Sequence, residues 1–141
     1  MRFDKFVNTI LEQKTPQYSA LVLNKDSKEA LLSDPQITKY LNKNHEIIAH
    51  HMTIKMGGLK GTLHEQRIGA IEKIHATHVG QTEDGNVVAV KVDGISDNKT
   101  PHITIGVNRD AGAKPVQSNN ITKWDILRTP IELLGQVEEL Y

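Results

Sequence analysis

The chain has 141 residues, enough for one domain with a hydrophobic core and too few for two of ordinary size. Lysine and arginine together number 17, as do aspartate and glutamate, so the formal net charge is zero. This balance argues against binding long duplex nucleic acid by bulk electrostatics, and the absence of cysteine excludes disulfides, zinc-thiolate sites and a cysteine nucleophile.

The N-terminal region is the first predicted element. Apolar residues recur at helical spacing over 2–13, which predicts an amphipathic helix. Pro16 ends this helix, so the N-terminal helical segment spans 1–16. Residues 18–23 form a short apolar run bounded by turn residues, which predicts a strand.

Two further helical segments are expected before the first long strand. Asp26 and Ser27 are suitable caps for a helix that carries the apolar residues at 30–32. Pro35 is expected to start another helical turn. The polar residues 42–44 then form a loop.

The rest of the chain alternates between β-rich runs and polar loops. Two of these runs are separated by Asp84-Gly85, which predicts a hairpin. The predicted strands are 46–56, 69–80, 86–93, 101–107 and 131–140, with loops at 57–61, 96–100 and 108–120. This balance of elements predicts an α+β fold with a mainly antiparallel sheet.

Nothing in the sequence indicates a membrane or secreted protein. No apolar run approaches the ~18 residues of a transmembrane helix, and residues 1–6 lack the apolar stretch of a signal peptide. We therefore expect a cytoplasmic protein, in the host cell cytoplasm if the chain is viral, that does not bind a membrane. No metal or other cofactor is expected, and the sequence identifies no protein partner.

Two stretches of the chain share one pattern: His51-Met52-Thr53-Ile54 and His102-Ile103-Thr104-Ile105. Each stretch lies in a predicted strand, where residues i and i+2 point to the same face. Each copy therefore presents one imidazole and one hydroxyl together, with apolar residues on the other face. If the two strands are neighbours, two histidines and two threonines meet in one cleft.

Such a set can cleave a phosphodiester by acid/base catalysis. One group must remove a proton from the attacking oxygen, and another must protonate the leaving oxygen. Histidine suits both tasks because its ordinary pKa of ~6.5 lies near working pH. The hydroxyls of Thr53 and Thr104 can hold the phosphoryl oxygens. A single His-x-Thr is common in strands by chance, so an unrelated α+β domain with coincidental motifs stays an alternative.

Lys55, Arg109 and Tyr18 have two interpretations each, and His50 has one. By strand alternation, Lys55 shares the face of His51 and can contact phosphate, or it is a solvated lysine. Arg109 can hold a second phosphate or the backbone of an RNA, or it is an ordinary surface charge. His50 is expected to point to the opposite face from His51, in a packing or surface role. Tyr18 can stack on a base or pack in the core.

The paired stretches at 51–54 and 102–105 resemble the signature of the two-histidine (2H) phosphoesterase superfamily, His-x-Thr/Ser-x-apolar, twice. Members include cyclic phosphodiesterases that open 2′,3′-cyclic phosphates, the phosphodiesterase domain of fungal and plant tRNA ligases, bacterial RNA 2′,3′-cyclic phosphodiesterases, and phage enzymes that destroy cyclic oligonucleotide signals. The resemblance runs from residue 18 to residue 140, although only the two motifs are specific.

The resemblance implies one 2H phosphoesterase-like domain over 1–141. Its expected fold is bilobal, with two mainly antiparallel sheet units around a central cleft and helices packed outside. By the same resemblance, His51 and His102 are the catalytic base and acid, and Thr53 and Thr104 bind the phosphate. Which histidine is the base and which the acid is not visible in the sequence.

Three functions stay open at this point. The first is a metal-independent phosphodiesterase acting on a small nucleotide or an RNA 3′-end, such as an RNA 2′,3′-cyclic phosphate. The second uses the same site to degrade cyclic di- or trinucleotide immune signals. The third is a module that binds a phosphorylated ligand or an RNA end without turning it over.

Overall fold

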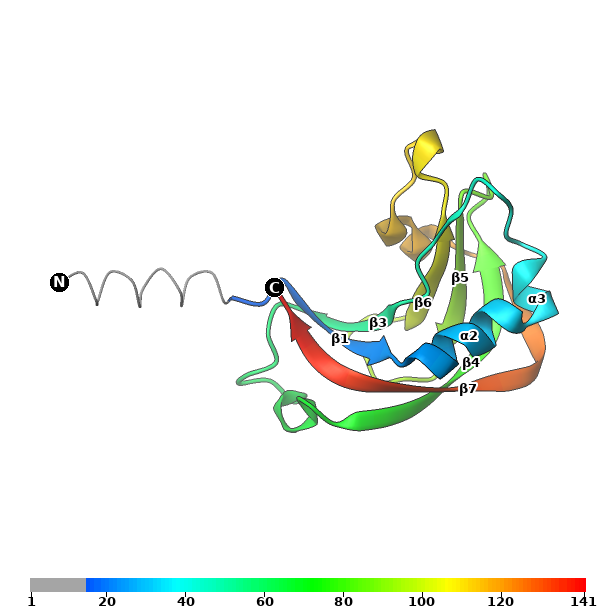
Figure 1. Ribbon diagram of the computed structural model, residues 1–141. Coiled ribbons are helices and arrows are strands. Elements are labelled where there is room, and N and C mark those ends of the chain that lie inside the picture. Colours follow the sequence, from blue (N-terminus) through cyan, green and yellow to red (C-terminus); the bar gives the residue numbers. More distant parts are fainter. Residues whose placement is uncertain (1–14) are drawn as a thin grey trace.

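The computed structural model describes residues 15–141, and Figure 1 shows the order of the elements along the chain. The predicted helix over 2–13 lies outside the described residues. The elements are β1 (Tyr18–Leu23), α2 (Lys25–Ser33), α3 (Pro35–Thr38), β2 (Glu46–Ile47), β3 (His51–Met56), η1 (Glu65–Arg67), β4 (Ile71–Gln81), β5 (Val87–Val92), β6 (His102–Val107), η2 (Arg109–Ala111), η3 (Pro115–Asn120) and β7 (Trp124–Leu140). The η elements are short 3-10 helices.

The strands form one antiparallel sheet that closes on itself. The strand order is β6-β3-β1-β7-β4-β5, and β5 pairs back with β6, so six strands make a barrel. The short β2 extends the pairing along β6. Closure leaves none of these six strands with a free edge. The predicted α+β fold with a mainly antiparallel sheet is confirmed.

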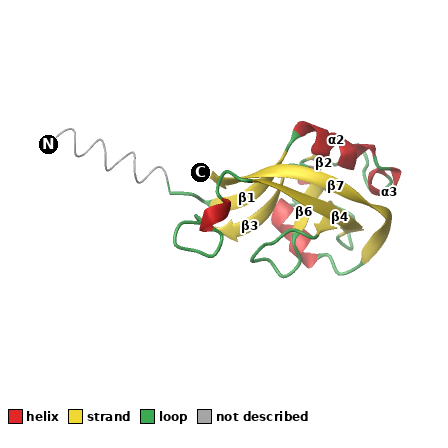
Figure 2. Ribbon diagram, turned by 90° about the horizontal axis from the view of Figure 1, so that it is seen from below, coloured by secondary structure: helices red, strands yellow, loops and turns green. Residues whose placement is uncertain are grey.

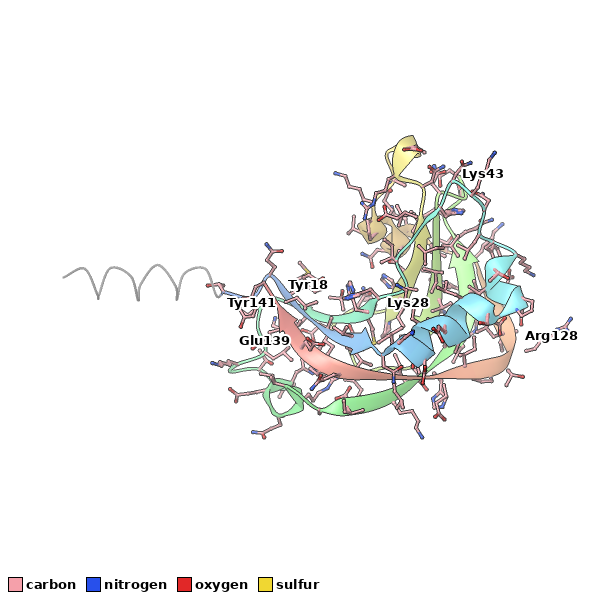
Figure 3. All side chains as sticks on the ribbon, in the orientation of Figure 1. Tyr18, Lys28, Lys43, Arg128, Glu139 and Tyr141 are labelled. Atoms are coloured by element: carbon pink, nitrogen blue, oxygen red, sulfur yellow. The ribbon has the colours of Figure 1, made fainter. Side chains whose placement is uncertain are left out.

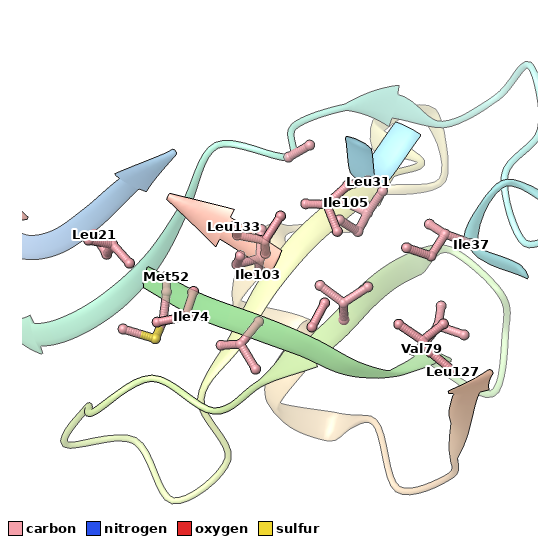
Figure 4. Close-up of a cluster of buried hydrophobic side chains, with 14 of the residues drawn as sticks. Leu21, Leu31, Ile37, Met52, Ile74, Val79, Ile103, Ile105, Leu127 and Leu133 are labelled. Atoms are coloured by element: carbon pink, nitrogen blue, oxygen red, sulfur yellow. The ribbon is translucent and has the colours of Figure 1, made fainter. Parts of the chain in front are cut away.

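The core fills the inside of this barrel. Alternate residues of each strand point inward, so the period of two in the sequence becomes a continuous apolar interior. Figure 4 shows Leu21, Met52, Ile103 and Leu133 converging from different strands. All four are fully buried and belong to one cluster. The core therefore holds the motif strands β3 and β6 in place through their inward-facing side chains.

Helices α2 and α3 lie on the outside of the barrel (Figures 1 and 2). The predicted caps of α2, Asp26 and Ser27, are wrong by two and three residues: Asn24 is the N-cap and accepts a hydrogen bond from the Ser27 amide (2.8 Å). The Ser27 hydroxyl instead accepts from the Leu134 amide (2.7 Å) and attaches the helix to β7. Pro35 begins α3, as predicted. No helix within 15–141 is long and apolar enough to span a bilayer.

Most predicted strands are present, and the differences have local causes. The hairpin of β4 and β5 is confirmed. The predicted strand over 46–56 is wrong in its middle, because Ala49 has a left-handed backbone (φ 43°) that separates β2 from β3. The last strand begins at Trp124 rather than at residue 131. Pro130 displaces the pairing with β4, whose partners jump from Ile126 to Ile131, but does not end the strand. The predicted loop over 108–120 contains η2 and η3.

Gly135 lies where β7 passes close to the backbone of β1. A methyl group added at this glycine would meet the Val22 carbonyl oxygen at 2.6 Å and carbonyl carbon at 3.0 Å. Since backbone atoms cannot move aside cheaply, we expect Gly135→Ala to lower the free energy of unfolding by about 1–3 kcal/mol, measured by urea denaturation.

Gly58→Ala is the matched control for this variant. Its added methyl would meet the carboxylate end of Glu139 at 2.8 Å, and a side-chain end can move away. We expect a smaller loss of stability than for Gly135→Ala. Equal stabilities for the two variants would contradict the proposed close approach of β1 and β7.

Candidate active site

The two motifs meet because β3 and β6 are antiparallel neighbours, with Met52 opposite Ile103. His51 and Thr53 flank this pairing on β3, and His102 and Thr104 flank it on β6. The pairing brings together, on one patch of sheet, all four residues expected to form the site.

The four side chains lie on the outer face of the barrel. Met52 and Ile103, which stand between them in sequence, are fully buried in the core. His51, Thr53, His102 and Thr104 are all half-buried. Alternation along each strand thus places the apolar side chain of the motif in the core and its histidine and threonine on the outside.

His51 packs against an aromatic ring of the neighbouring strand. The Tyr18 ring of β1 packs beside it, with ring centroids 5.2 Å apart and planes tilted by 36°; Figure 3 labels Tyr18 on this strand. Burial of the ring, together with the proximity of His50 and His102, lowers the pKa of His51 from 6.5 to about 4. The His51 ring is therefore neutral at neutral pH.

His50 lies beside His51 rather than on the opposite face, so the expectation for this residue is wrong. The two Nδ1 atoms are 2.9 Å apart, within hydrogen-bond distance, and the rings meet edge to face. Alternation fails here because His50 precedes β3. The Ala49 amide still donates to the Thr104 carbonyl oxygen (3.0 Å), and Met52 lies opposite Ile103, so the two extra residues, His50 and His51, follow the left-handed Ala49.

His102 is oriented by the loop that leads into β6. Its Nδ1 lies 2.9 Å from the Thr100 carbonyl oxygen, which can only accept, so Nδ1 carries a hydrogen. The Thr100 amide in turn donates to the Asn98 side chain (3.0 Å). This geometry directs Nε2 of His102 away from its own loop.

The same loop also holds the first motif. The Ser96 hydroxyl donates to the Thr53 carbonyl oxygen (2.7 Å), and the Asn98 side-chain amide donates to Asn119 of η3 (3.0 Å). In the second motif, the Thr104 hydroxyl lies 2.8 Å from the hydroxyl of Ser118, a buried residue of η3. Loop 96–100 and η3 therefore support both motifs from the side of β6.

Lys55 and Arg109 are each engaged by a carboxylate. The ammonium of Lys55 lies 3.9 Å from Asp97. A bulge in β3 makes the adjacent residues Ser19 and Ala20 face Lys55 and Thr53, which are two apart, yet exposure still alternates, with Thr53 and Lys55 half-buried and Ile54 buried. Arg109 pairs with Glu46 at 2.5 Å and follows the end of β6 opposite to His102. The structure does not bring Arg109 to the motif residues.

The supporting residues were not identified from the sequence. Ser96, Asn98 and Thr100 lie in a predicted polar loop whose composition is typical of side-chain-to-backbone hydrogen bonds. That composition gives no indication of which distant carbonyl such a side chain reaches. Ser118 lies in a segment predicted as loop, and no sequence signal connects it with Thr104.

Within residues 15–141, no group of three histidine or acidic side chains is arranged to hold a metal ion. A scan of the chain against protein-family models finds no match, and a search of the curated proteins finds none either. The geometry of the described residues therefore carries the functional argument.

The lowered pKa of His51 predicts a pH-dependent stability. Between pH 6.5 and about 4, the unfolded chain binds a proton at this ring that the folded protein does not. The contribution of His51 therefore makes stability fall as the pH falls through this window. In His51→Gln this contribution is absent, so we expect a smaller drop in the free energy of unfolding, measured by urea denaturation across the window. Parallel pH profiles for the two proteins would contradict the burial of this ring.

Proposed function

We propose that the protein is a metal-independent phosphodiesterase that acts on a nucleotide or RNA 3′-end, with a 2′,3′-cyclic phosphate as its representative substrate. The observation that carries the proposal is the pairing of Met52 with Ile103, which makes the two motif strands neighbours. This pairing supports a site in which two imidazoles and two hydroxyls face one phosphate. A coincidental pair of His-x-Thr tripeptides would have no reason to occupy adjacent strands in this register.

His51 is assigned as the base and His102 as the acid. A base must be unprotonated before the reaction, which agrees with the pKa of His51 at about 4. The negative charge of a bound phosphodiester raises this pKa and makes the ring a better base. His102 keeps its bond to the Thr100 carbonyl whether or not Nε2 is protonated, so Nε2 can deliver a proton to the leaving oxygen.

The two threonines are assigned to the non-bridging phosphoryl oxygens. Each is two residues after the histidine of its own strand, so its side chain lies on the same face as that imidazole. Thr104 is held in place by Ser118, which can donate to Thr104 while Thr104 donates to the phosphate. Lys55 and Arg109 are not needed for this arrangement, because Asp97 and Glu46 already engage them.

Membership of the 2H phosphoesterase superfamily and its bilobal arrangement are part of this proposal. The junction between the motif strands supports a division into two units. Strands β3 and β6 share one pairing, Met52 with Ile103, whereas β4 and β7 pair from Ile71 to Gly80. We place the boundary of the two units at this short junction, where the four motif residues lie.

Removal of either histidine is expected to abolish most of the activity. We expect His51→Ala and His102→Ala each to lower turnover by about 10²–10⁴-fold, since each removes one acid/base group. His75→Ala is the matched control, because His75 pairs with Asp93 and lies on β4, outside the motif strands. Both motif variants retaining the rate of His75→Ala in a steady-state assay would refute the assignment.

The Thr53 hydroxyl can be tested without disturbing the strand. Thr53→Val keeps the branched shape and the backbone carbonyl that Ser96 holds, and it removes only the hydroxyl. We expect kcat/KM to fall about 10- to 100-fold, the value of a hydrogen bond to a charged group, and Thr53→Ser to restore most of it. Equal rates for the valine and serine variants would exclude a role of the hydroxyl in phosphate binding.

The substrate class follows from one experiment. The purified protein is incubated, with and without a chelator, with RNA ending in a 2′,3′-cyclic phosphate, with cyclic di- and trinucleotides, and with linear diesters. Products are identified by mass, which also distinguishes attack by water from attack by a ribose hydroxyl. Turnover of cyclic oligonucleotides alone would favour degradation of immune signals. Tight binding without any product would contradict catalysis and favour the third function, a module that only binds its ligand.

A further inference from the structure

His50 makes the closest polar contact that the His51 ring has among the described residues. Its Nδ1 is 2.9 Å from Nδ1 of His51, and the two rings meet at 81° with centroids 5.1 Å apart. The His50 side chain is exposed, whereas that of His51 is half-buried against Tyr18. A polar nitrogen in such a setting needs a hydrogen-bond partner, and His50 provides it.

A hydrogen bond between two Nδ1 atoms contains one hydrogen, which belongs to one ring. If His50 donates, neutral His51 carries its own hydrogen on Nε2 and has no lone pair there. If His51 donates, its Nε2 is a free acceptor. The choice of donor thus determines whether His51 can accept a proton from an attacking oxygen.

We propose that His50 is the positioning residue of the site: its Nδ1 accepts the Nδ1 hydrogen of His51 and holds that ring in the form whose Nε2 is free. This rests on the proposed function, in which His51 is the base. When Nε2 takes the proton of the attacking oxygen, His51 becomes an imidazolium whose Nδ1–H stays bonded to His50.

The backbone explains why an adjacent residue can take this role. In a regular strand, neighbours in sequence point to opposite faces, and two consecutive histidines cannot meet. The left-handed backbone at Ala49 turns His50 toward His51, while the His50 carbonyl accepts from the Leu23 amide (2.9 Å) and fixes the turn to β1. A left-handed alanine is uncommon, and here it produces the contact.

The proposal predicts the tautomer of His51. In ¹⁵N-labelled protein without substrate, ¹H–¹⁵N correlation spectra of the imidazoles report which ring nitrogen carries hydrogen. At neutral pH we expect Nδ1 of His51 to be protonated and Nε2 to be bare. His50→Phe keeps an aromatic ring and removes the acceptor, so we expect the hydrogen to move toward Nε2. His50→Asn supplies a carbonyl acceptor, and we expect it to restore the Nδ1–H form.

Activity gives a second readout. We expect kcat/KM to fall about 10- to 100-fold in His50→Phe, the weight of a hydrogen bond to a charged group, and to recover in His50→Asn. His50→Ala replaces His50→Phe if the larger side chain prevents folding. A wild-type His51 protonated on Nε2, or a tautomer unchanged in the phenylalanine or alanine variant, would overturn the proposal. If the protein turns over no phosphodiester, the proposed function is wrong. The spectra would then still show whether His50 accepts the Nδ1 hydrogen of His51.

Discussion

The pairing of Met52 with Ile103 is the contact on which the site depends. Both side chains are fully buried, and burial of an apolar side chain of this size contributes about 1.5–3 kcal/mol. A slip of the pairing by one residue would place these side chains in water and the histidines in the core. The stability of the barrel interior and the geometry of the polar patch are therefore consequences of the same register.

Departures from regular strand geometry determine which other residues join the site. Bulges change the direction of side chains, and β3 has one near each end. The first, at Ala49, brings His50 to His51. The second lies opposite Ser19 and Ala20, between Thr53 and Lys55. Exposure still alternates across it, so Thr53 and Lys55 are both half-buried.

The sequence predicted the elements and side-chain directions that depend on local pattern. It did not predict those that depend on long-range contacts or on an unusual backbone conformation. Alternation and turn residues identified the β4–β5 hairpin, the strand of the second motif and the outward pairs of both motifs. Closure of the sheet is a long-range property that no segment encodes. The position of His50 required the left-handed backbone at Ala49, and the contact of Ser118 with Thr104 required the path of η3.

The charge state of the site connects its geometry with its proposed chemistry. In the absence of ligand, His51 resists protonation because it is buried and has His50 and His102 close by. An anion between the motif histidines opposes both effects, since it replaces lost hydration with an attractive charge. Anion binding and proton uptake are then linked, and each favours the other. A site of this kind is a weak acceptor of protons when empty and a stronger one when a phosphodiester occupies it, as a base that acts on bound substrate requires.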